Sequence, residues 1–264
     1  MRLINENVEM IFGLSPMAEA ESKDVQVVGF KINDTLEPEV WNDNMKMDSE
    51  VRDQLMEITS DFLESLPFDP NVEDVQLTGS LASYNWSKFS DVDLHIVIDF
   101  STVDEDEELV RDYFNAKRAV WNLKHEIYIY GYEVEIYVEN VGDEHIASGK
   151  YSVEKNDWIF KPTRDTDVKI PEDEVKKKAA SIMSQIERVE EVAQDDPAEA
   201  ESLAERIKEK IRKMRQSGLE SESGIYSVKN VAFKVLRRNG YLQRLSDIKT
   251  QSYDRLMSLA EIYR

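Results

Sequence analysis

The chain has 264 residues, of which 41% are hydrophobic and 33% charged, which is the profile of a globular protein with one large or two modest domains. It contains no cysteine, and this excludes disulfides, thiolate zinc sites and a cysteine nucleophile. No apolar run approaches the roughly 18 residues that a membrane helix needs, and polar and acidic residues interrupt the first six positions. We therefore expect a cytoplasmic protein without a membrane partner.

The formal net charge of -21 is unevenly distributed along the chain. Residues 206–244 contain 11 Lys or Arg against 3 Asp or Glu, a net of +8, so the remainder carries -29. An acidic surface repels the nucleic-acid backbone, so we expect no duplex DNA as a partner. The basic stretch suits a small polyanion such as a triphosphate, or it is simply a solvated helix face.

The first predicted elements lie before residue 67. Residues 1–48 are interpreted as an N-terminal extension that packs on the core, with a candidate strand over 25–32 and a turn anchored by Trp41. Asp48 occupies the position of a helix N-cap. Apolar residues then recur at helical spacing, which predicts an amphipathic helix over 49–66 that ends before Pro67.

The next stretch alternates between strands and helices. A short strand over 75–78 is interrupted by Gly79 and Ser80, and a short helix is expected over 81–88. Residues 91–98 and 126–139 alternate with a period of two, which is typical of strands. A helix with an acidic start is expected between them, over 104–122, and residues 140–168 are ambiguous.

After Pro171 the pattern becomes entirely helical. Four helices are expected, with Pro197 as the first residue of the second; they span 172–193, 197–218, 225–239 and 245–263. Mixed strands and helices followed by helices alone predict an α+β domain over 49–168 and an all-α helical domain over 169–264.

Acidic residues on the two alternating strands are the candidate catalytic groups. Asp91 and Asp93 are separated by one residue, so both side chains point to the same side of a strand. Two such carboxylates can share the divalent cations used in phosphoryl transfer, and Mg²⁺ prefers carboxylate and phosphate oxygens. Glu135, on the polar face of the later strand, is the candidate third acid, and Glu133 on the same face is its alternative.

The turn before the paired aspartates has a separate predicted role in phosphate binding. Gly79 allows the backbone to approach a phosphate closely, and the Ser80 hydroxyl and the N–H groups that open the following helix can receive an anion. Ser90, directly before Asp91, assists there or caps a turn. His95 shares the carboxylate face and is interpreted as a packed sheet residue rather than a pocket residue.

The stretches Leu77–Ser83 and Ser90–Leu94 resemble the glycine-serine and paired-aspartate signature of the DNA polymerase beta-like nucleotidyltransferase superfamily. The fuller stretch Gly79–Asp99 resembles predicted nucleotidyltransferases of tailed phages. The resemblance is strong over some 60 residues and weaker over most of the chain. It implies a nucleotidyltransferase-type mixed sheet flanked by helices, with Mg²⁺ or Mn²⁺ held by Asp91, Asp93 and a third acid. It also implies a nucleoside triphosphate donor.

The resemblance further implies that a helical second domain offers cations to the triphosphate. Lys229 and Lys234 are the candidates, and a solvated basic face is the alternative. The predicted activity is transfer of a nucleoside monophosphate to a hydroxyl of an unidentified small molecule, protein or RNA end. The alternative is a catalytically idle nucleotide-binding protein, or a toxin-like or antitoxin-like interaction protein, on the same fold. If the chain is phage-encoded, the cytoplasm is that of the host.

Overall fold

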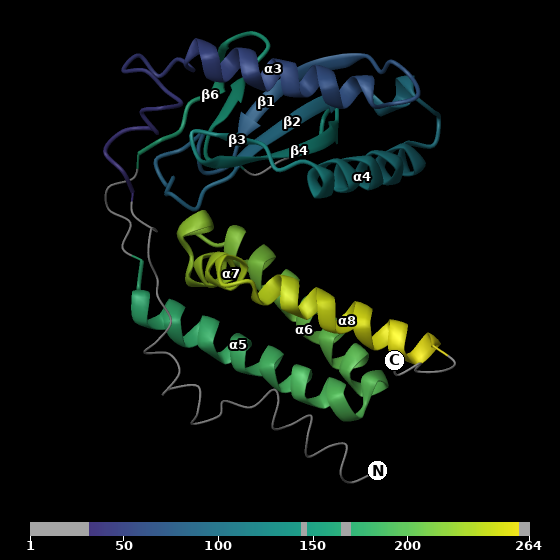
Figure 1. Cartoon of the computed structure of the whole chain (residues 1–264). Helices are drawn as coiled ribbons and strands as arrows, with labels where there is room; N and C mark the ends of the chain where they lie inside the picture. The colour runs from purple at the N-terminus through teal and green to yellow at the C-terminus, as the bar shows by residue number, and fades with distance from the viewer. Residues whose placement is uncertain (1–31, 144–146, 165–169, 259–264) are drawn as a thin grey trace. The chain divides into compact units, whose positions relative to one another are not determined.

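The structure, a computed structural model, describes residues 32–143, 147–164 and 170–258 (Figure 1). The described residues divide into two compact units, 32–164 and 170–258. They contain six α-helices and a six-stranded mixed sheet, which confirms the α+β class. Residues 25–31 of the candidate N-terminal strand lie outside the described residues.

The sheet of the first unit has the strand order β3-β4-β2-β1-β5-β6. Only β2 and β4 pair in parallel, and every other neighbouring pair is antiparallel. The strands are β1 (Val72–Thr78), β2 (Val92–Ile98), β3 (Tyr128–Ile129), β4 (Tyr132–Asn140), β5 (Lys150–Ser152) and β6 (Asp157–Phe160). Thus β5 and β6 arise from the stretch that was ambiguous by sequence, and the strand expected over 126–139 is a hairpin of β3 and β4.

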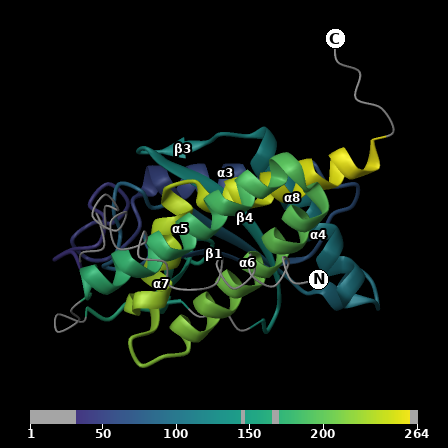
Figure 2. The ribbon, with the colours of Figure 1, turned by 90° about the horizontal axis from the view of Figure 1, so that it is seen from below.

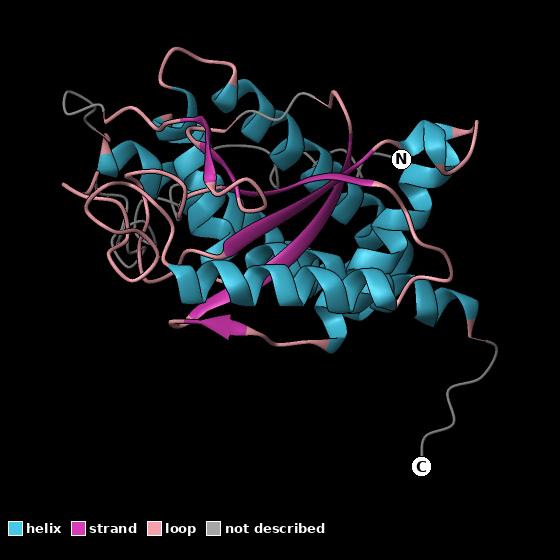
Figure 3. Ribbon diagram, turned by 90° about the horizontal axis from the view of Figure 1, so that it is seen from above, coloured by secondary structure: helices cyan, strands magenta, loops and turns pink. Residues whose placement is uncertain are grey.

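The two faces of the sheet differ because β2 and β4 alternate in polarity, as predicted. Apolar residues of both strands are buried on one face, where helix α3 (Ser49–Glu64) lies across the sheet (Figure 1 and Figure 3). Asp48 caps this helix, as expected, because its side chain accepts hydrogen bonds from the backbone N–H groups of Glu50 and Val51. The opposite face carries the acidic residues.

Helix α4 (Glu107–Lys124) connects the parallel strands β2 and β4 and lies along the edge of β4. The Asn122 side chain accepts a hydrogen bond from the Ile136 N–H (3.1 Å) and donates one to the Ile136 carbonyl (3.0 Å). The side-chain amide therefore takes the place of a neighbouring strand at this point of the β4 edge. Trp121 of α4 contacts Phe62 of α3 on the apolar side, and Arg118 of α4 reaches over the Tyr137 ring on the polar side, so α4 borders both faces at this edge.

The prediction of a short helix over 81–88 is wrong, because this segment forms turns. Its carbonyl groups accept hydrogen bonds from distant donors rather than from the N–H groups of a following helical turn. Trp41 Nε1 donates to the Leu81 carbonyl (2.8 Å), and the Asn33 side chain donates to the carbonyls of Tyr84 (3.1 Å) and Trp86 (2.7 Å). Trp41 is itself buried and stacks on Trp158, so the anchoring role expected for it is confirmed.

The second unit is helical over its described residues (Figure 2). Its helices are α5 (Glu172–Asp195), α6 (Pro197–Leu219), α7 (Val228–Arg238) and α8 (Tyr241–Met257). Each of the four buries apolar side chains against the others. Pro197 is the first residue of α6, as predicted, whereas α8 begins four residues before the expected Leu245, directly after the left-handed Gly240. Of the described helices, none has both the length and the apolar composition that a membrane-crossing segment requires.

Candidate active site

Four carboxylates lie on neighbouring strands at one end of the polar sheet face, and we call them the acidic quartet: Asp91, Asp93, Glu133 and Glu135. Asp93 of β2 and Glu135 of β4 are direct partners in the parallel register. Parallel strands lie about 4.8 Å apart, so these two side chains leave the sheet side by side. Asp91 directly precedes β2, and Glu133 lies two residues before Glu135 on β4.

Electrostatic effects within the quartet show how closely its members lie. The pKa of Glu133 is raised, first by burial and then by the negative charges of Glu135 and Asp91. Like charges disfavour ionisation of a neighbouring carboxyl, and a nearby cation would relieve this effect. Glu135 is the register partner of Asp93, and which of Glu133 and Glu135 is the third acid stays a prediction.

Gly79 brings the Asp93 carboxylate against the backbone that follows β1. Thr78 is the register partner of Asp93, and Gly79 has a φ of +74°. A Cβ atom at Gly79 would lie 1.8 Å from Asp93 Oδ2, so no side chain fits there while Asp93 keeps its position. Glycine was expected to allow close approach of a phosphate; the structure shows that it allows close approach of a carboxylate.

Two serines close the loop between Gly79 and Asp91. Ser80 Oγ donates to Ser90 Oγ (2.7 Å), and Ser90 Oγ accepts from the Ser87 N–H (3.0 Å). Ser90 therefore caps a turn, which was one of the two roles considered for it. Because no helix follows Gly79, the array of helical N–H groups expected to bind phosphate is absent from residues 81–88.

Two further polar residues on this face, Tyr137 and Glu139, were not identified from the sequence. Tyr137 OH donates to Glu135 Oε2 (2.5 Å), and the pKa of Tyr137 is raised by burial and by the charge of Glu135, so the phenol stays a donor. The buried His95 lies between Thr78 Oγ1 (3.0 Å from Nε2) and Glu139 Oε1 (2.7 Å from Nδ1). His95 is thus a packed sheet residue, as expected. The period of two along β4 was the available signal for Tyr137 and Glu139.

The quartet has the donor chemistry that magnesium prefers, since all four groups offer carboxylate oxygens. Asp93 and Glu135 are adjacent on neighbouring strands. A bound cation would offset the repulsion between the negative charges of Glu133, Glu135 and Asp91. Over residues 32–143, 147–164 and 170–258, however, no group of three or more histidine or acidic side chains is close enough together to hold a metal ion. The donors fit a hard cation, but the side chains are not arranged as a three-ligand site.

The two candidate triphosphate-binding lysines lie on α7, in the second unit. Lys229 is exposed, and its Nζ donates to Ser217 Oγ (2.6 Å) at the end of α6. Lys234 is half-buried, one turn further along the helix. Their part in triphosphate binding stays a prediction.

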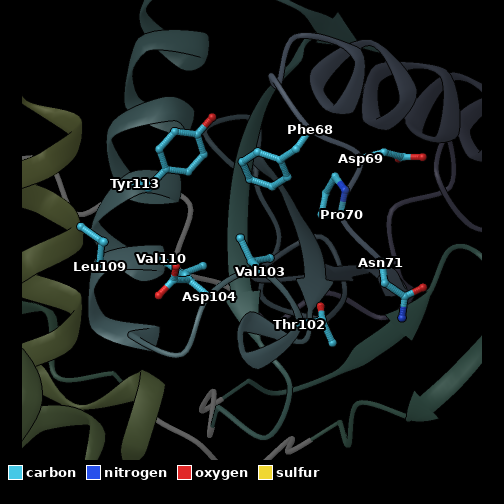
Figure 4. A pocket seen from close by; sticks show the side chains of 10 residues that line it. All are labelled: Phe68, Asp69, Pro70, Asn71, Thr102, Val103, Asp104, Leu109, Val110 and Tyr113. Atoms are coloured by element: carbon cyan, nitrogen blue, oxygen red, sulfur yellow. The ribbon is translucent and has the colours of Figure 1, made fainter.

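A cavity of about 680 Å³ lies at the other end of the sheet, away from the quartet (Figure 4). It is lined by residues that precede β1 and follow β2, among them Phe68, Val103 and Tyr113. Gly79 and Asp91 lie at the opposite ends of these strands, about 20 Å away at roughly 3.3 Å per residue. The cavity is therefore not part of the acidic site.

Comparisons of the chain with protein-family models, with curated proteins and with solved structures find no match. The motifs of the chain and the geometry of the quartet are therefore what indicates a function.

Proposed function

We propose that the chain is a metal-dependent nucleotidyltransferase of the DNA polymerase beta-like type. It transfers a nucleoside monophosphate from a nucleoside triphosphate to an acceptor hydroxyl, with release of pyrophosphate. The observation that carries this proposal is the register of Asp93 with Glu135 on parallel strands, beside a glycine at which a Cβ atom would displace the Asp93 carboxylate. A strand bearing two aspartates next to a strand bearing a third acid is the arrangement that the sequence signature implies.

Each residue of the site has a distinct task in this proposal. Asp91, Asp93 and Glu135 would hold Mg²⁺ or Mn²⁺, which would supply positive charge to offset that of the transferring phosphoryl group. Gly79 keeps the Asp93 carboxylate against the backbone, and Ser80 and Ser90 fix the loop that leads into Asp91. Glu135 also orients the acceptor hydroxyl, while Lys229 and Lys234 bind the triphosphate.

The test is nucleotide turnover in the presence of Mg²⁺ or Mn²⁺. We expect wild-type protein to release pyrophosphate from an α-labelled nucleoside triphosphate and to transfer the label to an acceptor offered as a mixture of polyols, proteins and RNA. Asp93→Asn should lower the rate about 100-fold or more, the range found when a group that stabilises transition-state charge is removed. Glu73→Gln is the matched control, because Glu73 is an exposed acid of β1 on the same sheet.

Two outcomes would contradict the proposal. Nucleotide binding without any turnover by the wild-type protein would identify an idle nucleotide-binding fold. Turnover that Asp93→Asn leaves unchanged would show that the chemistry takes place elsewhere.

A further inference from the structure

Tyr137 on β4 is held between two other side chains on the polar face of the sheet. Its ring stacks on that of His95, with 4.9 Å between the centroids and 16° between the planes. The Arg118 guanidinium carbon lies 4.8 Å from the Tyr137 ring centroid. His95 belongs to β2 and Arg118 to α4, so the two approach from opposite edges of β4. Such cation–π and stacking contacts restrict the ring to one orientation.

The neighbours of Tyr137 are themselves fixed. His95 contacts Thr78 and Glu139 through its two ring nitrogens, and Arg118 Nε donates to Asn115 Oδ1 (3.1 Å). The phenol oxygen is therefore presented from a rigid position on a strand, and it donates to Glu135 Oε2 (2.5 Å). One lone pair of Oε2 is engaged in this way, and the other lone pairs of the carboxylate, including both on Oε1, can bind a ligand.

Glu133 differs from Glu135 in the hydrogen bonding of its carboxylate. Both are half-buried on the same face of β4, two residues apart. Over the part of the chain that the structure describes, no hydrogen bond to the Glu133 carboxylate is present, so its side chain keeps more rotamer freedom. A carboxylate that is already oriented loses less entropy when it binds a cation, and groups behind a metal ligand commonly fix it in this way.

We propose that Tyr137 is a positioning residue that holds the Glu135 carboxylate toward Asp93 and thereby makes Glu135, rather than Glu133, the third acid of the site. This inference rests on the proposed function, because it assumes that the acids bind a divalent cation. It adds a residue that the paired-aspartate signature does not contain.

The test is direct binding of Mn²⁺, measured by the EPR signal of the free ion and without any nucleotide turnover. The variants are Tyr137→Phe, Glu135→Gln, Glu133→Gln, Asp93→Asn and the double variants of Tyr137→Phe with each glutamine substitution. Phenylalanine keeps the ring between His95 and Arg118 and removes only the hydroxyl, so folding should be retained and is checked by circular dichroism. Tyr128→Phe makes the same change at an exposed tyrosine of β3 and is the matched control.

We expect Tyr137→Phe to weaken Mn²⁺ binding about tenfold, the lower end of the range for groups that orient a metal ligand, and Tyr128→Phe to leave it unchanged. Combined with Glu135→Gln, Tyr137→Phe should add no further loss. In the double variant with Glu133→Gln, the losses of Mn²⁺ affinity from the two substitutions should add. A merely structural role for Tyr137 would not produce this difference between the two double variants.

Two results would overturn the inference, and they have different consequences for the proposed function. If Tyr137→Phe binds Mn²⁺ as the wild type does while Asp93→Asn and Glu135→Gln bind it more weakly, the positioning role fails and the metal site stands. If Asp93→Asn and Glu135→Gln also bind Mn²⁺ as the wild type does, the proposed metal site fails, and the role of Tyr137 fails with it.

Discussion

Gly79 lies against the Asp93 carboxylate. Replacing Gly79 would have two effects, one on the backbone conformation and one on the position of Asp93. Its φ of +74° costs a residue with a side chain about 1–2 kcal/mol. In addition, a Cβ atom would displace Asp93 Oδ2. Gly240 has the same φ of +74°, but a Cβ atom there would meet nothing within 4 Å. Gly240→Ala therefore isolates the backbone cost.

We predict that Gly79→Ala and Gly240→Ala lower the free energy of unfolding by similar amounts, about 1–2 kcal/mol, in urea titrations. Only Gly79→Ala should also lower Mn²⁺ affinity and the rate of nucleotidyl transfer, by about tenfold or more, because it moves a metal-binding carboxylate. Equal Mn²⁺ affinity in the two variants would show that the position of Asp93 does not depend on Gly79.

Glu37 gives a prediction on pH dependence at the same scale. It is 4% exposed, its pKa is raised above the ordinary value of 4.5 chiefly by burial, and Oε2 has no hydrogen-bond partner among the described residues. The folded state therefore binds the proton more tightly than the unfolded state does. The stability that this gives is fully present below pH 4.5 and is lost as the pH rises through the folded-state pKa.

Glutamine resembles the protonated form of Glu37 and does not ionise. We expect Glu37→Gln to unfold at higher urea concentration than the wild type at pH 7, and the difference to shrink toward zero near pH 4. Asp43→Asn is the control, since Asp43 is an exposed acid of the same unit. A wild-type stability that exceeds that of Glu37→Gln at pH 7 would mean that the buried carboxylate is stabilised by its surroundings.

At the scale of elements, the sequence predicts best where one face of an element is buried. The alternation of β2 and the helical spacing of α3 follow from burial against each other, and both are confirmed. The segment over 81–88 has helix-like spacing but forms turns, because Trp41 and Asn33 engage its carbonyls from 40 to 53 residues away. No local pattern contains that information.

The candidate site was predictable where its residues lie close together in the sequence. Asp91, Asp93 and Gly79 belong to a contiguous motif, so the sequence brings them together. Which glutamate lies beside Asp93 depends on the register of two parallel strands joined through a helix, and a shift of two residues would exchange Glu133 and Glu135. Tyr137 was missed because its role depends on a stacked histidine from β2 and an arginine from α4.

At the scale of the whole molecule, the acidic quartet and the basic stretch belong to different units. The acidic quartet belongs to the first unit, and the basic stretch 206–244 belongs to the second. A triphosphate bound by carboxylate-held cations still carries negative charge, which lysines can offset at short range.

The proposal that Lys229 and Lys234 bind the triphosphate is tested by the affinity for a non-hydrolysable triphosphate with Mg²⁺, measured by calorimetry. We predict that Lys229→Ala and Lys234→Ala each raise the dissociation constant about tenfold, because a hydrogen bond between charged groups contributes about 1.5–3 kcal/mol. Lys213→Ala should leave it unchanged, since Lys213 is an exposed residue of α6 that pairs with Glu209. If neither α7 lysine affects the dissociation constant while Asp93→Asn does, the basic stretch is a solvated face and the triphosphate is bound by the first unit alone.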